Sequence, residues 1–130
     1  MAKVDLHNGE QVIDTSLDNV VIIQMLECIV GGRSLDVTNF KPSVIQAGHI
    51  IIRDKQNEKE YKPMPVNEDN SAYEALPENH EIVGVAYSSA LTRKPFMTIM
   101  VRGTVNQVAS PYPVTDAIKT ALPLIRFTQD

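Results

Sequence analysis

The chain has 130 residues, a net charge of −4 and a pI near 5.3. Its hydrophobic fraction of 43% and charged fraction of 22% are those of one globular domain with its own core, which excludes an intrinsically disordered chain. The negative balance argues against nucleic acid as a partner, and a single cysteine excludes an intramolecular disulfide.

Residues 1–19 are polar and show no sustained period, so we expect a loose N-terminal arm there and a single β-rich domain over 20–130. The N-terminus lacks the apolar stretch of a signal peptide, and no apolar run is long enough to span a membrane. We therefore expect synthesis in a reducing cytoplasm and no membrane partner.

Residues 20–30 are dense in β-branched side chains and stop at a glycine pair, which is typical of a strand. A helix remains an alternative, because a short apolar run fits either structure. Cys28 in this run is expected to be a small buried hydrophobe. Residues 34–41 are interpreted as an extended edge, since Pro42 excludes a central strand.

A hairpin is predicted next. Residues 49–53 form an isoleucine-rich strand, the polar segment 54–58 has the length of a hairpin loop, and residues 60–62 return beside the strand. Residues 63–80 are acidic and contain prolines, so we expect a surface loop.

Two further strands are predicted in the second half of the chain. Residues 81–87 are apolar on both faces, as in a buried strand, and Gly84 among them indicates close approach of a neighbouring backbone. Residues 96–105 alternate between apolar and polar, which predicts one half-buried antiparallel strand.

Towards the C-terminus the spacing of apolar residues changes from that of a strand to that of a helix. Pro113 suits the first turn of a helix, Ile118 and Leu122 share an apolar face, and Pro123 ends the helix. Residues 124–127 then fit a short closing strand. The predicted fold class is α+β and β-dominated: a small antiparallel sheet or barrel-like domain with a short C-terminal helix and a loose N-terminal arm.

The sequence contains no recognisable catalytic pattern. The histidines His7, His49 and His80 are scattered, and none has the spacing of a metal-ligand pair. Asp36 and Asp54 are interpreted as turn acids rather than as paired carboxylates. We therefore predict no catalytic, cofactor-binding or metal-binding residue, no cofactor, and a non-enzymatic function in binding and assembly.

Two features bear on assembly. Met97 falls on the buried face of the predicted strand 96–105, whereas Met100 falls on the opposite face beside Arg102. We interpret Met100 and Arg102 as a subunit contact with adaptable packing, and simple partial burial of Met100 is the alternative.

Charge is also distributed unevenly along the chain. Acids predominate from Glu58 to Glu81, and bases predominate later, from Arg93 to Arg126. Opposite patches suit a self-complementary assembly, and an ordinary solvated surface is the alternative.

The order of several segments resembles the head decoration (auxiliary capsid) proteins and head fibre proteins of tailed bacteriophages. The segments that carry this resemblance are Gly32–Thr38, Ala47–Asp54, Glu81–Ala86, Met100–Val105 and the helix-then-strand close Ile118–Phe127. Each motif is short, and their order along much of the chain gives the resemblance its weight.

The resemblance implies a homotrimer on the outer surface of the virion capsid, where it clamps neighbouring major capsid protein subunits of the mature shell. It also implies that the N-terminal arm binds the capsid. In this chain the arm residues would be Lys3, Val4, Asp5, Leu6, Val12 and Ile13, whose apolar members suit an added strand. A disordered tail without a partner is the alternative for this segment.

Two other functions remain open. The first is the base domain of a head fibre, which shares the virion location. The second, from a different class, is a small-molecule-binding or hydrolytic β-domain whose site forms between subunits.

Overall fold

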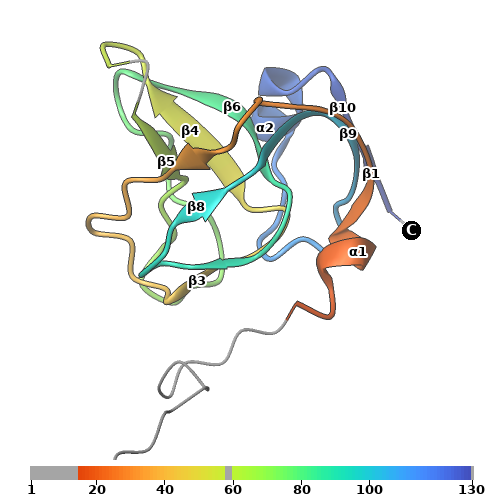
Figure 1. Cartoon of the computed structure of the whole chain (residues 1–130), viewed down its shortest axis with the longest axis horizontal. Helices are drawn as coiled ribbons and strands as arrows, with labels where there is room; N and C mark the ends of the chain where they lie inside the picture. The colour runs from red at the N-terminus through yellow and green to blue at the C-terminus, as the bar shows by residue number, and fades with distance from the viewer. Residues whose placement is uncertain (1–14, 58–59, 130) are drawn as a thin grey trace, which may run out of the picture.

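The computed structural model describes residues 15–57 and 60–129 of the chain (Figure 1). It has the predicted α+β, β-dominated fold, with a mainly antiparallel sheet and two short helices. The elements in chain order are α1 (Asp18–Val21), β1 (Ile22–Cys28), β2 (Arg33–Ser34), β3 (Val44–Ile45), β4 (Ile50–Asp54), β5 (Tyr61–Pro63), β6 (His80–Ala86), β7 (Ala90–Leu91), β8 (Phe96–Met97), β9 (Ile99–Asn106), α2 (Asp116–Ala121) and β10 (Ile125–Thr128). In this described part of the chain, neither helix has the length and apolarity needed to cross a membrane.

The main sheet has six strands in the order β1-β9-β6-β4-β5, with β10 placed beside β9. β9 pairs with β1 along one edge, and its other edge is shared by β6 at the start of the strand and by β10 at its end. The β10 pairing is parallel, whereas the other pairings in this sheet are antiparallel. Two small two-stranded sheets, β2-β8 and β3-β7, complete the fold.

The core lies on both faces of the main sheet, and β4 supplies side chains to both. Ile50 and Ile52 pack in one apolar cluster with Ile118 of α2, and Ile51 packs in a second cluster with Ile99. The second cluster also contains side chains from the two small sheets. A strand with apolar side chains on both faces is stable only where both faces are covered, and the three isoleucines of β4 are fully buried.

The folded part begins earlier than residue 20, where the sequence placed the end of the arm. Asp18 accepts hydrogen bonds from the backbone N–H and the hydroxyl of Ser89, at 3.0 and 2.7 Å. These bonds attach α1 to the segment that follows β6. The helix ends at Val21 and the predicted strand is confirmed from Ile22 onward.

The predicted hairpin is confirmed, and the segment after it is more structured than a surface loop. Met64 and Val66 are buried, and an isolated bridge joins Val66 to Tyr73. The Tyr73 hydroxyl accepts the backbone N–H of Ile50 at 3.1 Å, which fixes the segment to the start of β4. The sequence missed this because its prolines and acids indicate a loop but do not indicate what the loop packs against.

Gly84 confirms the expected close approach. A Cβ atom at this position would overlap the carbonyl oxygen of Met100 on the neighbouring strand, so only glycine allows β6 and β9 to pair here. His80, predicted in a loop, is instead the first residue of β6.

The predicted single strand over residues 96–105 is divided. Met97 ends β8, Thr98 separates the two strands, and β9 begins at Ile99. The alternation therefore does not run through this point, and Met100 is fully buried at 0% exposure instead of lying on the surface. The prediction of Met100 as an exposed subunit contact is wrong, because its side chain belongs to the core cluster beneath β9.

The C-terminal helix and closing strand are both confirmed, with a later helix start. Thr115 caps α2 by accepting the backbone N–H of Ile118 at 3.4 Å, so the helix begins at Asp116 rather than at Pro113. The helix ends before Pro123, as predicted.

Candidate functional site

β1 forms an edge of the main sheet, and its apolar side chains are mostly exposed. Ile22 is buried, but Ile23, Met25 and Leu26 are 49%, 37% and 54% exposed. Cys28 is only partly buried, although the sequence predicted burial. The strand prediction for this run is correct from Ile22 onward, and in the described part of the sheet β1 is an edge strand whose side chains from Ile23 to Glu27 are exposed.

The β1–β9 register is irregular at three places, and two of them involve an extra residue on β1. Ile22 pairs with Val105 and Gln24 with Thr104, so Ile23 is an extra residue between them. Leu26 is likewise an extra residue, because Met25 pairs with Gly103 and Glu27 pairs with Arg102. Bulges of this kind interrupt the alternation of a strand, and they place two branched apolar side chains at the sheet edge.

Gly103 of β9 allows this arrangement. A Cβ atom there would overlap the carbonyl oxygen of Gln24 and the sulfur of Met100. A larger residue would therefore push β1 away from β9 or displace the core beneath it. The bulged edge depends on a glycine at this position.

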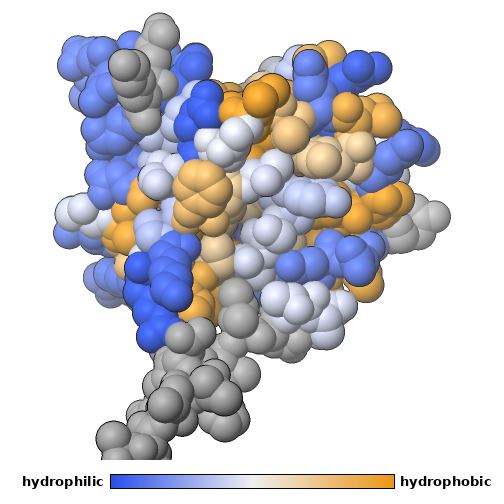
Figure 2. Space-filling view, viewed as in Figure 1, coloured by the Kyte–Doolittle hydropathy of each residue, from blue (hydrophilic) through white to orange (hydrophobic). Residues whose placement is uncertain are grey.

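The exposed apolar residues of β1 and of the chain segments on either side of it are together called the edge patch. It consists of Leu17, Val20, Ile23, Met25, Leu26 and Val30, all at least 37% exposed. Hydrophobic residues are visible at the surface on the side of the molecule where β1, β9 and β10 are drawn (Figures 1 and 2). Concentrated apolar exposure of this kind marks an interaction surface in soluble proteins.

Charged side chains accompany the edge patch. Glu27 is exposed on β1 and lies opposite the exposed Arg102 of β9 in the strand register. The edge patch therefore carries one acid and one base beside its apolar side chains. Arg102, predicted as a subunit contact, lies at the border of this surface.

A second feature is a hollow between α2 and the segment 74–76, which we call the helix hollow. Its cavity volume is about 600 Å³. Much of its lining is apolar, with Met64, Leu76, Ile82, Ala117 and Ala121 among the lining residues.

The charged residues at the helix hollow are of both signs. Lys55 and Glu74 line it and are exposed. Glu81 also lines it, but its carboxylate is paired with the Arg53 guanidinium, with 2.9 Å between Nε and Oε1. Lys55 and Glu74 are thus the charged groups that the hollow presents to solvent.

His80 lies between the helix hollow and a second hollow of about 370 Å³ beside residues 36–41. Its Nδ1–H donates a hydrogen bond to the carbonyl oxygen of Glu78 at 2.7 Å. Its Nε2 is buried and has no hydrogen-bond partner among the described residues.

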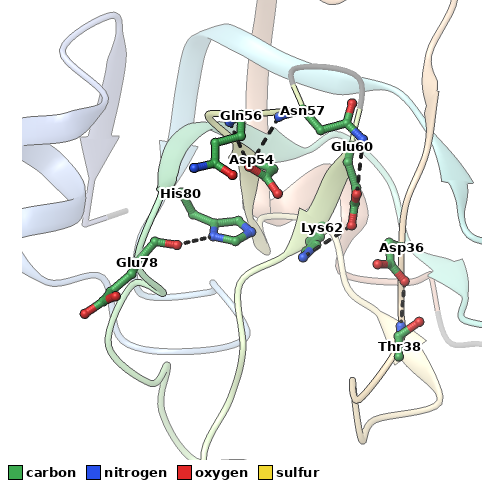
Figure 3. A network of polar contacts seen from close by, with 9 residues as sticks. All are labelled: Asp36, Thr38, Asp54, Gln56, Asn57, Glu60, Lys62, Glu78 and His80. Carbon is green, nitrogen blue, oxygen red and sulfur yellow. Dashed lines mark hydrogen bonds and ion pairs between the residues drawn. The ribbon is translucent and has the colours of Figure 1, made fainter.

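Figure 3 shows the polar contacts around the ends of β4, β5 and β6. Asp54 accepts the backbone N–H of Gln56 at 2.8 Å, and Asp36 accepts that of Thr38 at 3.0 Å. Hydrogen bonds from Gln56 to Asp54 and from Thr38 to Asp36 hold the pKa of both carboxyls below its usual value. The two acids stabilise turns, as the sequence predicted.

His49 lies in an aromatic cluster. The rings of Phe40, Tyr73 and Tyr112 contact it edge-on, with centroids 5.2 to 5.4 Å away. Its Nε2–H donates to the carbonyl oxygen of Met64 at 2.9 Å, and burial lowers its pKa to about 4. Every side of the ring is occupied by core contacts, so His49 is a structural residue.

The predicted capsid-binding residues Lys3, Val4, Asp5, Leu6, Val12 and Ile13 lie outside the described residues. Within residues 15–57 and 60–129, no three His, Cys, Asp or Glu side chains are grouped so that they hold a metal ion. Sequence reasoning missed the edge patch and the helix hollow. The polar residues Gln24 and Glu27, three apart in an apolar run, were a signal that the alternation of β1 is interrupted.

No family model, no curated protein and no solved structure matches this chain.

Proposed function

We propose that this protein is a non-enzymatic component of a tailed-bacteriophage head, which binds the outside of the capsid as a trimer and stabilises the mature shell. The sequence resemblance supports the capsid role, and the observation that carries the assembly into an oligomer is the edge patch, whose exposed apolar side chains suit a protein contact. Exposed apolar side chains on β1 and on the segments next to it favour contact with another protein.

The proposed mechanism is mass action. A protein that binds only the mature lattice stabilises that lattice in proportion to its concentration and its affinity for that state. Joining copies in a trimer raises the effective concentration of each remaining contact once the first has formed. Weak contacts of single subunits thereby add up to stable attachment.

The N-terminal residues 1–14 are proposed to contribute capsid contacts. They directly precede α1 and the edge patch in the sequence. The apolar members of this segment, Val4, Leu6, Val12 and Ile13, suit strand addition to the capsid protein.

A small-molecule-binding function is the second candidate, and the helix hollow favours it. Its volume of about 600 Å³ lies in the range of ligand pockets, and its lining combines apolar side chains with polar groups. A capsid role requires that the protein bind capsid particles, whereas a small-molecule-binding role does not, so one binding experiment separates the two.

That experiment is co-sedimentation of the purified protein with expanded capsids and, in parallel, with unexpanded precursor capsids. We expect saturable binding to the expanded particles and little binding to precursors, and a rise in the temperature at which the expanded particles release DNA. Equal binding to both particles, or to neither, would contradict the proposal. A variant that lacks residues 1–14 is expected to keep its oligomeric state and to bind capsids more weakly.

A further inference from the structure

The edge patch exposes apolar side chains, and the helix hollow is an open space with a largely apolar lining. The patch ends in two branched aliphatic side chains, Ile23 and Leu26, which the register shifts place at the sheet edge. The hollow is lined largely by apolar side chains. Ile23 and Leu26 are three residues apart on β1, which is roughly 10 Å along a strand.

The charges beside the two surfaces also match. Glu27 and Arg102 accompany the edge patch, and Lys55 and Glu74 are exposed at the helix hollow. When the edge of one molecule enters the hollow of another, we expect Glu27 to meet Lys55 of the partner and Arg102 to meet Glu74. Matched charges of this kind steer association and disfavour wrong registers.

The bulges argue against direct pairing of two β1 strands. A regular edge offers an uninterrupted row of N–H and C=O groups to a second strand, whereas bulges interrupt this row and protect the edge from strand addition. The exposed side chains of β1 remain uncovered under such protection. A partner that covers them must pack against the side chains rather than pair with the strand, and a hollow lined by apolar residues is such a partner surface.

We propose that the edge patch of one subunit docks into the helix hollow of a second copy of this chain, through Ile23 and Leu26. The contact is head-to-tail, because the two surfaces are different parts of the molecule. A head-to-tail contact forms a closed ring when its rotation closes, and a three-membered ring is such a case. The inference rests on the proposed trimer and assigns its subunit contact.

The test uses one variant for each surface. Leu26→Asp places a charge on the edge patch, and Ala117→Trp fills the helix hollow from α2, where Ala117 is exposed. For each variant alone, the dissociation constant of the oligomer is expected to rise at least about tenfold. The aliphatic side chain of Leu26 is absent in the first variant and has no space to enter in the second, so its burial is lost in both. Oligomer mass is measured by sedimentation velocity over a range of concentrations.

Mixing the two variants gives the decisive result. Each retains one intact surface, so an equimolar mixture is expected to form a one-to-one dimer of twice the 14.4 kDa chain and to extend no further. A mixture that stays monomeric, or either variant remaining trimeric alone, overturns the proposal. A small molecule as the natural occupant of the hollow predicts that Ala117→Trp leaves the oligomer unchanged, which also overturns it.

Charge reversal tests the register independently of apolar packing. Glu27→Lys and Lys55→Glu are each expected to weaken association severalfold, and the double variant is expected to recover most of the loss. Phe96→Asp is the matched control, because Phe96 is 60% exposed on β8, outside both surfaces, and should leave the assembly intact. No recovery in the double variant contradicts the proposed register.

Capsid attachment is measured separately, so the two proposals fail in different ways. If unmodified trimers do not bind expanded capsids, the proposed function is wrong while the subunit contact stands on its own data. If the variants remain trimeric and still bind capsids, the contact is wrong and the function stands.

Discussion

β4 and β1 are both isoleucine-containing apolar strands, and they have opposite surroundings. The isoleucines at 50, 51 and 52 of β4 are fully buried between two apolar clusters, whereas Ile23 and Leu26 of β1 are about half exposed. β4 lies between β5 and β6, and β1 lies at the edge with a bulged register. The two strands differ in what covers their faces: apolar clusters cover both faces of β4, whereas β1 is exposed from Ile23 to Glu27.

The largest effect is expected from truncation within β4. Ile51→Ala removes a fully buried side chain from the second cluster and should lower the free energy of unfolding by about 2–5 kcal/mol. Urea unfolding monitored by circular dichroism provides the measurement. A cost below about 1 kcal/mol would mean that β4 is not the rigid centre that its burial indicates.

The next effect concerns pH and His49, which lies directly before β4. Its pKa is about 4 in the folded protein and about 6.5 in the unfolded chain, so the unfolded chain binds the proton more readily. The contribution of His49 to the free energy of unfolding is therefore fully present above pH 6.5. It falls as the pH drops towards 4, by up to about 3 kcal/mol.

Unfolding free energies measured by urea titration between pH 7 and pH 4 test this dependence. His49→Gln should be less stable at neutral pH and should show a shallower pH dependence. An unchanged slope in that variant would assign the acid sensitivity to other groups.

A smaller effect is expected at the junction that connects the two regions. Gly84→Ala places a Cβ against the Met100 carbonyl oxygen where β6 meets β9, and overpacking of this kind costs about 1–3 kcal/mol. The urea midpoint should fall without a change in slope. If the midpoint does not move, β6 and β9 are less closely paired than the register indicates.

The smallest effect on folding is expected at the edge itself. Ile23→Ser changes an exposed side chain and should alter monomer stability by no more than about 0.5 kcal/mol, measured at concentrations where the protein is dissociated. The same variant should associate more weakly. A large loss of monomer stability would show that Ile23 serves the core, and would remove the contrast between β1 and β4.

Local signals in the sequence were sufficient for several elements. The hairpin loop after β4, the end of α2 before Pro123 and the close approach at Gly84 each depend on one residue type or a short spacing. These features follow from steric limits on the backbone, which neighbours in the sequence reveal.

Other features depend on pairing between distant segments, and the sequence did not predict them. Met100 is buried where Thr98 separates β8 from β9, and Leu26 is an extra residue of β1 that has no partner on β9 in the strand register. The helix hollow arises where α2 approaches residues 74–76, which are far away in the chain. Such features require the register and the packing to be known.

The parallel pairing of β10 with β9 has a consequence for how this chain folds as it is synthesised. β9 is flanked by β1 from the early part of the sequence and by β10 from residues 125–128. The part of its edge from Gly103 to Asn106 therefore stays unpaired until residues 125–128 have left the ribosome. Until then the nascent chain carries an unsatisfied strand, and contacts between remote segments form slowly, so this interval is when chaperones or premature partners have access to it.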